Sequence, residues 1–114
     1  MKPFPPILRE RRRYIIFKIN SSQKFTKREI EKALTDVVFR TIGLFGAVDS
    51  SYWLVKFYED KQVGVIRVTN EFKDVLFACL AFLEEVNNHK VILKLIKTTG
   101  TIKKAEEIIK KLNY

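Results

Sequence analysis

Residues 98–104, Thr-Thr-Gly-Thr-Ile-Lys-Lys, have the composition of an anion-binding turn that opens a helix. The first N–H groups of a helix have no partner inside it, and the helix dipole adds partial positive charge there. With Thr101 as the N-cap, Lys103 and Lys104 fall in the first turn, where acidic side chains are usually favoured. Each lysine should cost about 0.3 to 1 kcal/mol there unless an anion is present. The segment predicts either a bound phosphate or two lysines that are simply solvated.

The excess basic residues are concentrated at the two ends of the chain. The net charge is +9, and residues 14–88 contain ten Lys or Arg and ten Asp or Glu, so the whole excess lies in residues 1–13 and 89–114. A polyanion such as RNA is the partner that this balance favours.

No group of residues has the spacing of a catalytic or metal site. His89 is the single histidine, and the single cysteine, Cys79, lies in an apolar helical pattern typical of a core position. The acidic pairs at 59–60 and 84–85 fall at a turn and at a helix end, where acids are usually solvated. We therefore expect no independent active site, and no metal or cofactor bound by the chain itself.

The apolar patterns predict the order strand, helix, strand, strand, helix, strand, helix. The clearest helix begins at Thr26, because Glu29 completes a capping box, and Gly43 should end it. Asn70 should cap the second helix, whose apolar stripe continues to Val86. The predicted elements cover, in order, residues 14–19, 26–43, 51–58, 62–69, 70–86, 91–96 and 102–112.

This order predicts the split βαβ, or ferredoxin-like, arrangement that RNA recognition modules share. It is an α/β (α+β) sandwich in which two helices cover one face of a four-stranded antiparallel sheet. The other face is too apolar to stay fully exposed, so the C-terminal helix or a partner should cover part of it. The candidate residues for that face are Tyr14, Ile16, Leu54, Val65 and Ile92.

RNA recognition modules stack unpaired bases on aromatic residues of the third strand. The corresponding strand here, residues 62–68, contains no aromatic residue. Tyr14, Tyr52 and Tyr58 are then either stacking platforms or, more in keeping with strand residues, cross-strand packing residues. The sequence favours recognition of phosphates and shape over the reading of bases.

Composition and length predict one domain, residues 14–114, preceded by a basic Pro- and Arg-rich arm, residues 1–13. The N-terminal residues lack the apolar segment of a signal peptide, and no apolar run reaches about 18 residues. We expect a soluble, cytoplasmic protein that does not enter a membrane.

Three stretches, residues 8–15, 63–68 and 90–104, together resemble the archaeal and eukaryal ribonuclease P protein family called protein component two. They read Leu-Arg-Glu-Arg-Arg-Arg-Tyr-Ile, Val-Gly-Val-Ile-Arg-Val, and Lys-Val-Ile-Leu through to Thr-Gly-Thr-Ile-Lys-Lys. The resemblance covers nearly the whole chain, in order and at matching spacing. Thr99 stands where the family often has serine, which is a conservative change for a capping hydroxyl.

The resemblance implies a subunit of ribonuclease P, the ribonucleoprotein that removes the 5′ leader of precursor transfer RNA. In this family the RNA subunit carries the Mg²⁺-dependent chemistry. The resemblance also implies that the protein pairs with a larger TIM-barrel-like subunit, often as a 2:2 heterotetramer, and works beside other ribonuclease P proteins. Arg67 is expected either to contact RNA or to pair with an acid near the start of the second helix. The implied RNA-contacting residues are Arg9, Arg11, Arg12, Arg13, Arg67, Lys97, Thr99, Gly100, Thr101, Lys103 and Lys104.

Four apolar residues are candidates for contact with a protein partner. Leu44 and Phe45 lie beyond Gly43, in a predicted loop that either folds back onto the core or meets the partner. Phe77 and Phe82 widen the apolar stripe of the second helix, which suggests burial on more than one side. Two other functions are open: a small-molecule-sensing ferredoxin-like domain, and an adaptor that binds only proteins.

Overall fold

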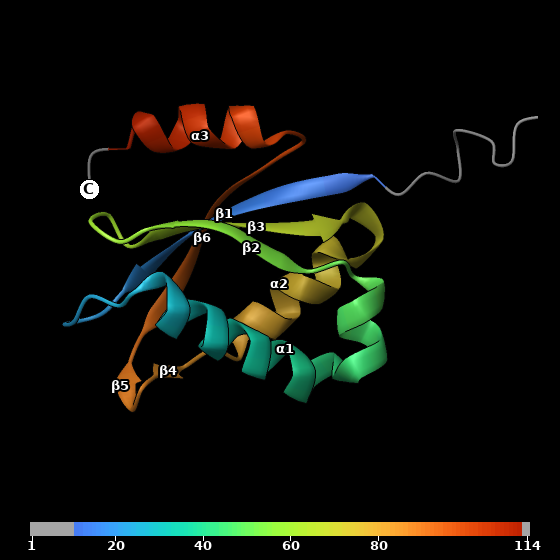
Figure 1. Ribbon diagram of the computed structural model, residues 1–114, viewed down its shortest axis with the longest axis horizontal. Helices are drawn as coiled ribbons and strands as arrows, with labels where there is room; N and C mark the ends of the chain where they lie inside the picture. Colours follow the sequence, from blue (N-terminus) through green and yellow to red (C-terminus); the bar gives the residue numbers. More distant parts are fainter. Residues whose placement is uncertain (1–10, 113–114) are drawn as a thin grey trace, which may run out of the picture.

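The computed structural model describes residues 11–112, in which a four-stranded antiparallel sheet lies between two layers of helix (Figure 1). The order of strands across the sheet is β2-β3-β1-β6, and every neighbouring pair is antiparallel. The ferredoxin-like order predicted from the sequence is confirmed. The strands of this sheet are β1 (Arg12–Asn20), β2 (Trp53–Tyr58), β3 (Val63–Thr69) and β6 (Ile92–Thr99).

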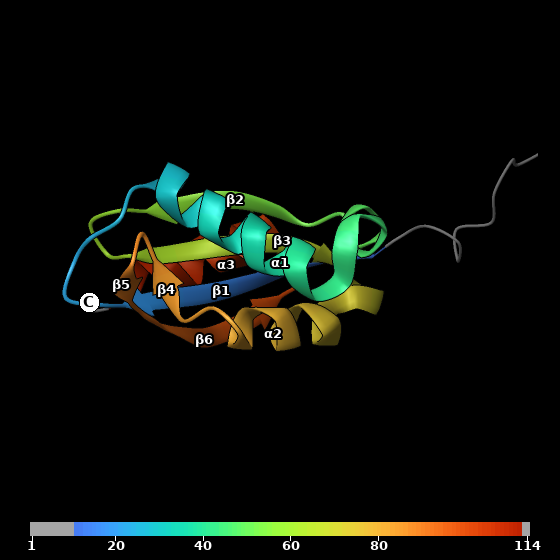
Figure 2. The same ribbon diagram turned by 90° about the horizontal axis from the view of Figure 1, so that it is seen from below.

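Helices α1 (Lys27–Asp49) and α2 (Lys73–Ala81) lie side by side on one face of the sheet (Figure 2). They bury the main core, because the strands turn alternate apolar residues toward them. Cys79 is fully buried in this core, as predicted. The largest side chains shared between the sheet and the two helices are Ile15, Phe17, Ile30, Leu34, Ile66, Leu76 and Leu80.

Helix α1 begins with the predicted capping box: Thr26 accepts a hydrogen bond from the Glu29 backbone, and the Glu29 carboxylate accepts one from the Thr26 backbone. Gly43 interrupts the helix where the sequence predicts its end, but a second helical segment, and not the expected loop, follows it within α1. Gly43 adopts φ 75° and ψ −178°, a conformation that only glycine enters readily, and the chain then resumes helical geometry to Asp49. Leu44 and Phe45 therefore lie on a second helical segment and not in a loop.

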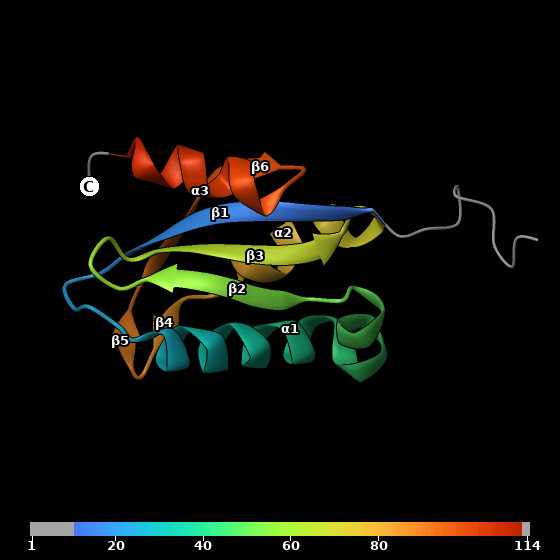
Figure 3. The same ribbon diagram turned by 45° about the horizontal axis from the view of Figure 1, so that its top comes forward.

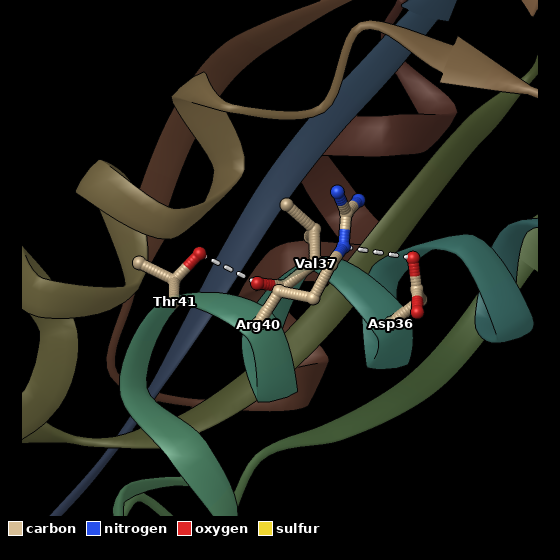
Figure 4. A network of polar contacts seen from close by, with 4 residues as sticks. All are labelled: Asp36, Val37, Arg40 and Thr41. Atoms are coloured by element: carbon tan, nitrogen blue, oxygen red, sulfur yellow. Dashed lines mark hydrogen bonds and ion pairs between the residues drawn. The ribbon is translucent and has the colours of Figure 1, made fainter.

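Two side-chain contacts hold the helix just before this kink (Figure 4). Arg40 and Asp36 form an exposed ion pair at 3.0 Å. Thr41 Oγ1 donates to the Val37 carbonyl oxygen at 2.6 Å, a bond of the kind that bends helices slightly. The Thr41 bond and the freedom of Gly43 together explain why the helix axis changes direction here.

The second helix is shorter than the sequence predicted. A 3₁₀ turn, η2 (Asn70–Phe72), precedes α2, and Asn70 does not cap the helix. After α2 the chain forms a small hairpin of β4 (Glu85–Val86) and β5 (His89–Lys90), which was not predicted. Asn87 and Asn88 make its turn with positive φ, which asparagine tolerates better than most residues. Val86 is buried in the same core as the apolar residues of α2. In the sequence it therefore looks like a continuation of the apolar stripe of that helix.

Helix α3 (Ile102–Lys110) covers the opposite face of the sheet, as the sequence allowed. Ala105 and Ile109 pack on Ile16, Val63 and Val65. Two polar contacts also hold α3 in place. Lys56 forms an ion pair with Glu106 at 3.1 Å, and Lys61 Nζ donates a hydrogen bond to the Ile109 carbonyl oxygen at 3.1 Å. None of the helices described in residues 11–112 is long and apolar enough to cross a membrane.

The predicted apolar face is partly correct. Tyr14, Ile16 and Val65 belong to the cluster beneath α3. Leu54 does not: a bulge between Leu54 and Lys56 shifts the alternation, and Leu54 pairs with Ile66 and points into the main core. Ile92 lies outside both clusters and is 69% exposed.

Candidate nucleic-acid interface

Three segments that are far apart in the sequence meet at one end of the sheet, where β1 begins and β3 and β6 end (Figure 3). Arg12 pairs with Thr69, and Tyr14 pairs with Arg67 on one side and with Thr99 on the other. Helix α3 starts directly after β6, at the same end. We call this region the basic sheet end; its predicted RNA-contacting residues are Arg11, Arg12, Arg13, Arg67, Thr99, Gly100, Thr101, Lys103 and Lys104.

Arg13 links two parts of the basic sheet end. Its Nε donates a hydrogen bond to Asn70 Oδ1 at 3.0 Å. Its Nη1 lies 3.3 Å from the position that a Cβ atom would occupy on Gly100, so the absence of a side chain at Gly100 leaves room for the guanidinium group. The Asn70 backbone N–H also donates to the Arg11 carbonyl oxygen at 2.7 Å. The start of β1 is thus tied to the turn before α2.

The start of α3 has the predicted cap. Thr101 is extended, with φ −139° and ψ 151°, and its Oγ1 accepts a hydrogen bond from the Lys104 backbone at 3.2 Å. Thr99 Oγ1 donates to the Thr101 carbonyl oxygen at 2.9 Å and so holds the turn. The first turn of α3 contains no acid, whereas α1 has Glu29 in that position. The Lys103 and Lys104 side chains are exposed beside the cap.

Arg67 makes no ion pair with any residue between 11 and 112. The alternative prediction, that it pairs with an acid near the start of the second helix, is therefore wrong for Glu71 and Asp74. The Arg67 Nε atom is buried without a hydrogen-bond partner in this part of the chain. Lys97 is exposed on β6 and pairs with Ile16, farther from the basic sheet end than Thr99. Arg9 lies outside the described residues.

The tyrosines behave as packing residues. Tyr14 and Tyr58 pack against the cluster beneath α3, and Tyr52 packs against the main core. Burial raises the pKa of the Tyr52 phenol. The aromatic residue that the sequence analysis missed is Trp53, which pairs with Arg67 and is 56% exposed. A face could not be assigned to Trp53 from sequence, because the bulge in β2 is not visible there.

The apolar candidates for protein contact differ in exposure. Leu44, Phe45 and Phe82 are exposed, and Phe45 most of all at 83%. Phe77 is partly buried and packs against the main core. Val48, which was not among the candidates, is also exposed on the helical segment that carries Leu44 and Phe45. Leu44, Phe45 and Val48 are on α1 and Phe82 is the C-cap of α2, so the exposed apolar side chains of this group belong to the face opposite α3.

The described acidic and sulfur side chains do not assemble into a metal site: between residues 11 and 112 no three of His, Cys, Asp or Glu are grouped to hold an ion. The His89 ring lies against Phe25, with ring centroids 6.4 Å apart. Burial raises the pKa of the Cys79 thiol.

The chain is similar in sequence to proteins that share one name. It is 40% identical over 104 residues to "Ribonuclease P protein component 2" of Pyrococcus furiosus, covering 90% of this chain and 86% of that protein. It is 31% identical over 106 residues to the protein of the same name from Methanocaldococcus jannaschii, covering 93% of this chain and 78% of that protein.

Its fold matches a chain of the cryo-EM structure of yeast ribonuclease MRP with a TM-score of 0.65 and 14% identity, over 97% of this chain and 96% of the other. At that level of identity the match supports the fold alone. The model of one protein family, Rpp14/Pop5, matches residues 13–110, which include every described strand and helix except the first residue of β1. This chain belongs to the Rpp14/Pop5 family.

Proposed function

We propose that this protein is a subunit of ribonuclease P and supports removal of the 5′ leader from precursor transfer RNA. The name shared by its relatives, ribonuclease P protein component 2, supports this proposal. The observation that carries it is the basic sheet end, where Arg12, Arg67 and Thr99 come from three separate segments and adjoin through strand pairing. RNA phosphates are the anions that such a surface would bind in this complex.

The chemistry of the contact follows from the residue types. Guanidinium groups such as those of Arg12 and Arg13 can bind a phosphate through two parallel hydrogen bonds. Lys103 and Lys104 add point charges beside a helix N-terminus, where the dipole also favours an anion. These groups recognise phosphate and shape, so they would support a folded RNA without reading its sequence.

The RNA subunit would hold the Mg²⁺ ions and carry out hydrolysis, and the protein would neutralise phosphate charge where RNA segments approach one another. This division assigns no catalytic role to the chain's own side chains. The proposal also has the protein act in the cytoplasm, together with precursor transfer RNA.

A protein partner would bind the helices on the other face. Leu44, Phe45 and Phe82 are large apolar side chains exposed there, and isolated soluble domains rarely expose such residues together. The partner in this proposal is the larger TIM-barrel-like subunit of ribonuclease P, in a 2:2 assembly, alongside other proteins of the complex. Protein pairing would then use the exposed side of α1 and α2, and RNA contact would use the basic sheet end.

Reconstitution tests the proposed function. The RNA subunit, the larger partner protein and precursor transfer RNA are mixed with Mg²⁺, with or without this chain, and release of the 5′ leader is followed with time. The proposal predicts that omitting the chain slows cleavage at low Mg²⁺, because unneutralised phosphates then oppose folding of the RNA. Equal cleavage rates with and without the chain would contradict it.

A further inference from the structure

A row of four side chains crosses the whole sheet at its basic end. Trp53 on β2 pairs with Arg67 on β3, Arg67 pairs with Tyr14 on β1, and Tyr14 pairs with Thr99 on β6. Directly paired residues of antiparallel strands point to the same face, so all four lie on the face that α3 partly covers. Tyr14 is half-buried under that helix, but Trp53 is 56% exposed.

Helix α3 does not cover the corner of the sheet at Trp53, because its polar contacts on that side of the sheet are made farther along the chain. Helix α3 contacts β2 through Glu106, which forms an ion pair with Lys56, and it contacts the turn after β2 through the Ile109 carbonyl oxygen, which accepts a hydrogen bond from Lys61. Both contacts lie on the far side of the β2 bulge from Trp53. The start of β2 is therefore not covered by the helix.

Arg67, which pairs with Trp53, has a polar atom without a partner, and so does Thr69, two positions farther along β3. Arg67 Nε and Thr69 Oγ1 are buried and form no hydrogen bond within residues 11–112. Thr69 is 3% exposed, and it follows Arg67 by two positions on β3, which places both on the same face of the sheet. Buried polar groups are nearly always paired, so an unpaired guanidinium nitrogen on the residue opposite an exposed aromatic ring is a feature that a site for a ligand with hydrogen-bonding edges would have.

We propose that Trp53 stacks on an unpaired RNA base while Arg67 donates a hydrogen bond to the same nucleotide. The inference rests on the proposed RNA-binding role and adds to it a contact with single-stranded RNA. Aromatic rings on a sheet surface bind bases of any sequence, because every base has a π face. Trp53 would thus favour unpaired over paired RNA without selecting a base.

The charge around the row favours RNA over a protein at this corner. Arg12 pairs with Thr69, and Arg13 and the cap of α3 lie at the same end of the sheet. The exposed apolar side chains suited to a protein partner, such as Phe45 on α1 and Phe82 at the C-cap of α2, belong to the opposite face. A single exposed tryptophan beside several cations is typical of a stacking site for nucleic acid.

The chain contains one tryptophan, so its intrinsic fluorescence reports on this corner alone. The full chain is titrated with a short single-stranded RNA and, separately, with an RNA hairpin whose stem has as many phosphates. We expect the single strand to quench Trp53 emission and the stem to bind with little quenching. With a dye-labelled single strand followed by anisotropy, Trp53→Ala should weaken binding roughly 5- to 150-fold, and Trp53→Phe should restore most of the affinity.

Several outcomes would overturn the inference. Unchanged emission at saturation with the single strand, or equal single-strand affinity for Trp53→Ala and the unaltered chain, would show that the ring does not stack. Emission that changes only when the larger partner protein is added would assign the corner to a protein contact. If the stem binds normally in these cases, only this inference fails; if neither RNA binds, the proposed RNA contact of the basic sheet end fails with it.

Discussion

The Arg13 side chain is held by Asn70, whose Oδ1 accepts a hydrogen bond from Arg13 Nε at 3.0 Å. This bond leaves the terminal nitrogens of the guanidinium group unused by Asn70 and places one of them beside Gly100. A charged group that is already oriented loses less conformational freedom when it binds an anion. Asn70, expected from sequence to cap a helix, instead orients an arginine of the basic sheet end.

Replacing Asn70 with alanine should weaken RNA binding without removing a phosphate contact. Affinity should fall, while the slope of log K against log salt should stay close to that of the unaltered chain. Arg13→Ala removes the charge itself and should reduce the slope by about 0.7 to 0.9. The matched control is Asn20→Ala, an exposed asparagine at the other end of β1. Equal affinities for the two asparagine variants would show that Asn70 does not orient Arg13.

Gly64 should be intolerant of any side chain. It pairs with Phe17, and a Cβ atom on Gly64 would lie 2.5 Å from Phe17 Cζ and 3.0 Å from Phe57 Cδ1, inside the core. Gly64→Ala should lower the free energy of unfolding by about 1 to 3 kcal/mol, measured by urea denaturation. Adding Phe17→Leu should cost less in the Gly64→Ala background than in the unaltered chain, because it relieves the clash. Additive losses in the double variant would count against this explanation.

Glu29 should make the stability of the fold depend on acid pH. The pKa of its carboxylate is lowered below the ordinary 4.5, mainly by the hydrogen bond from the Thr26 backbone, with smaller contributions from the Thr26 and Asn87 side chains. Because the folded-state pKa is the lower one, the charged carboxylate contributes stability above the unfolded-state pKa, and this contribution is lost as pH falls through the folded-state pKa.

Unfolding of the unaltered chain and of Glu29→Gln, measured by denaturant from about pH 7 to about pH 3, checks this. Glutamine keeps an oxygen that can accept the Thr26 hydrogen bond but cannot ionise. The stability difference between the two proteins should shrink toward the acid end. A difference that is constant across the range would contradict the assignment.

Phe45 should matter for protein pairing and not for folding. It is 83% exposed, so Phe45→Ser should leave the urea midpoint nearly unchanged while weakening binding to the larger subunit, measured by calorimetry. Ile92→Ser is the control, because Ile92 is also well exposed, at 69%, on an edge strand away from α1. If Ile92→Ser weakens pairing as much as Phe45→Ser, the partner does not select the helical face.

The sequence was informative where local signals agree with the fold. The capping box of Thr26 and Glu29 and the threonine cap at Thr101 are short-range hydrogen-bond patterns, and both are present as predicted. The order of strands and helices follows from apolar periodicity, which also placed Ile16 and Val65 on the face under α3.

The errors arise where tertiary contacts override local preference. Val86 continues a helical apolar pattern, yet it is buried from a hairpin because Asn87 and Asn88 allow a tight turn with positive φ. Leu54 was assigned to the wrong face because a bulge shifts the alternation in β2. Trp53 was missed for the same reason. The meeting of β1, β3 and the start of α3 in one basic cluster depends on strand register, which no local pattern gives.

The central claim is that the basic sheet end supplies RNA contacts that ribonuclease P needs. It is tested most directly by the rate of 5′-leader removal in the reconstituted complex with Lys103→Glu/Lys104→Glu, compared with Lys110→Glu/Lys111→Glu. Both variants make the same charge change on α3, the first at its start and the second at its end. The first should slow cleavage roughly tenfold or more, as expected for lost charge-assisted phosphate contacts, and the second should change it little. Equal rates for the two variants would contradict the claim.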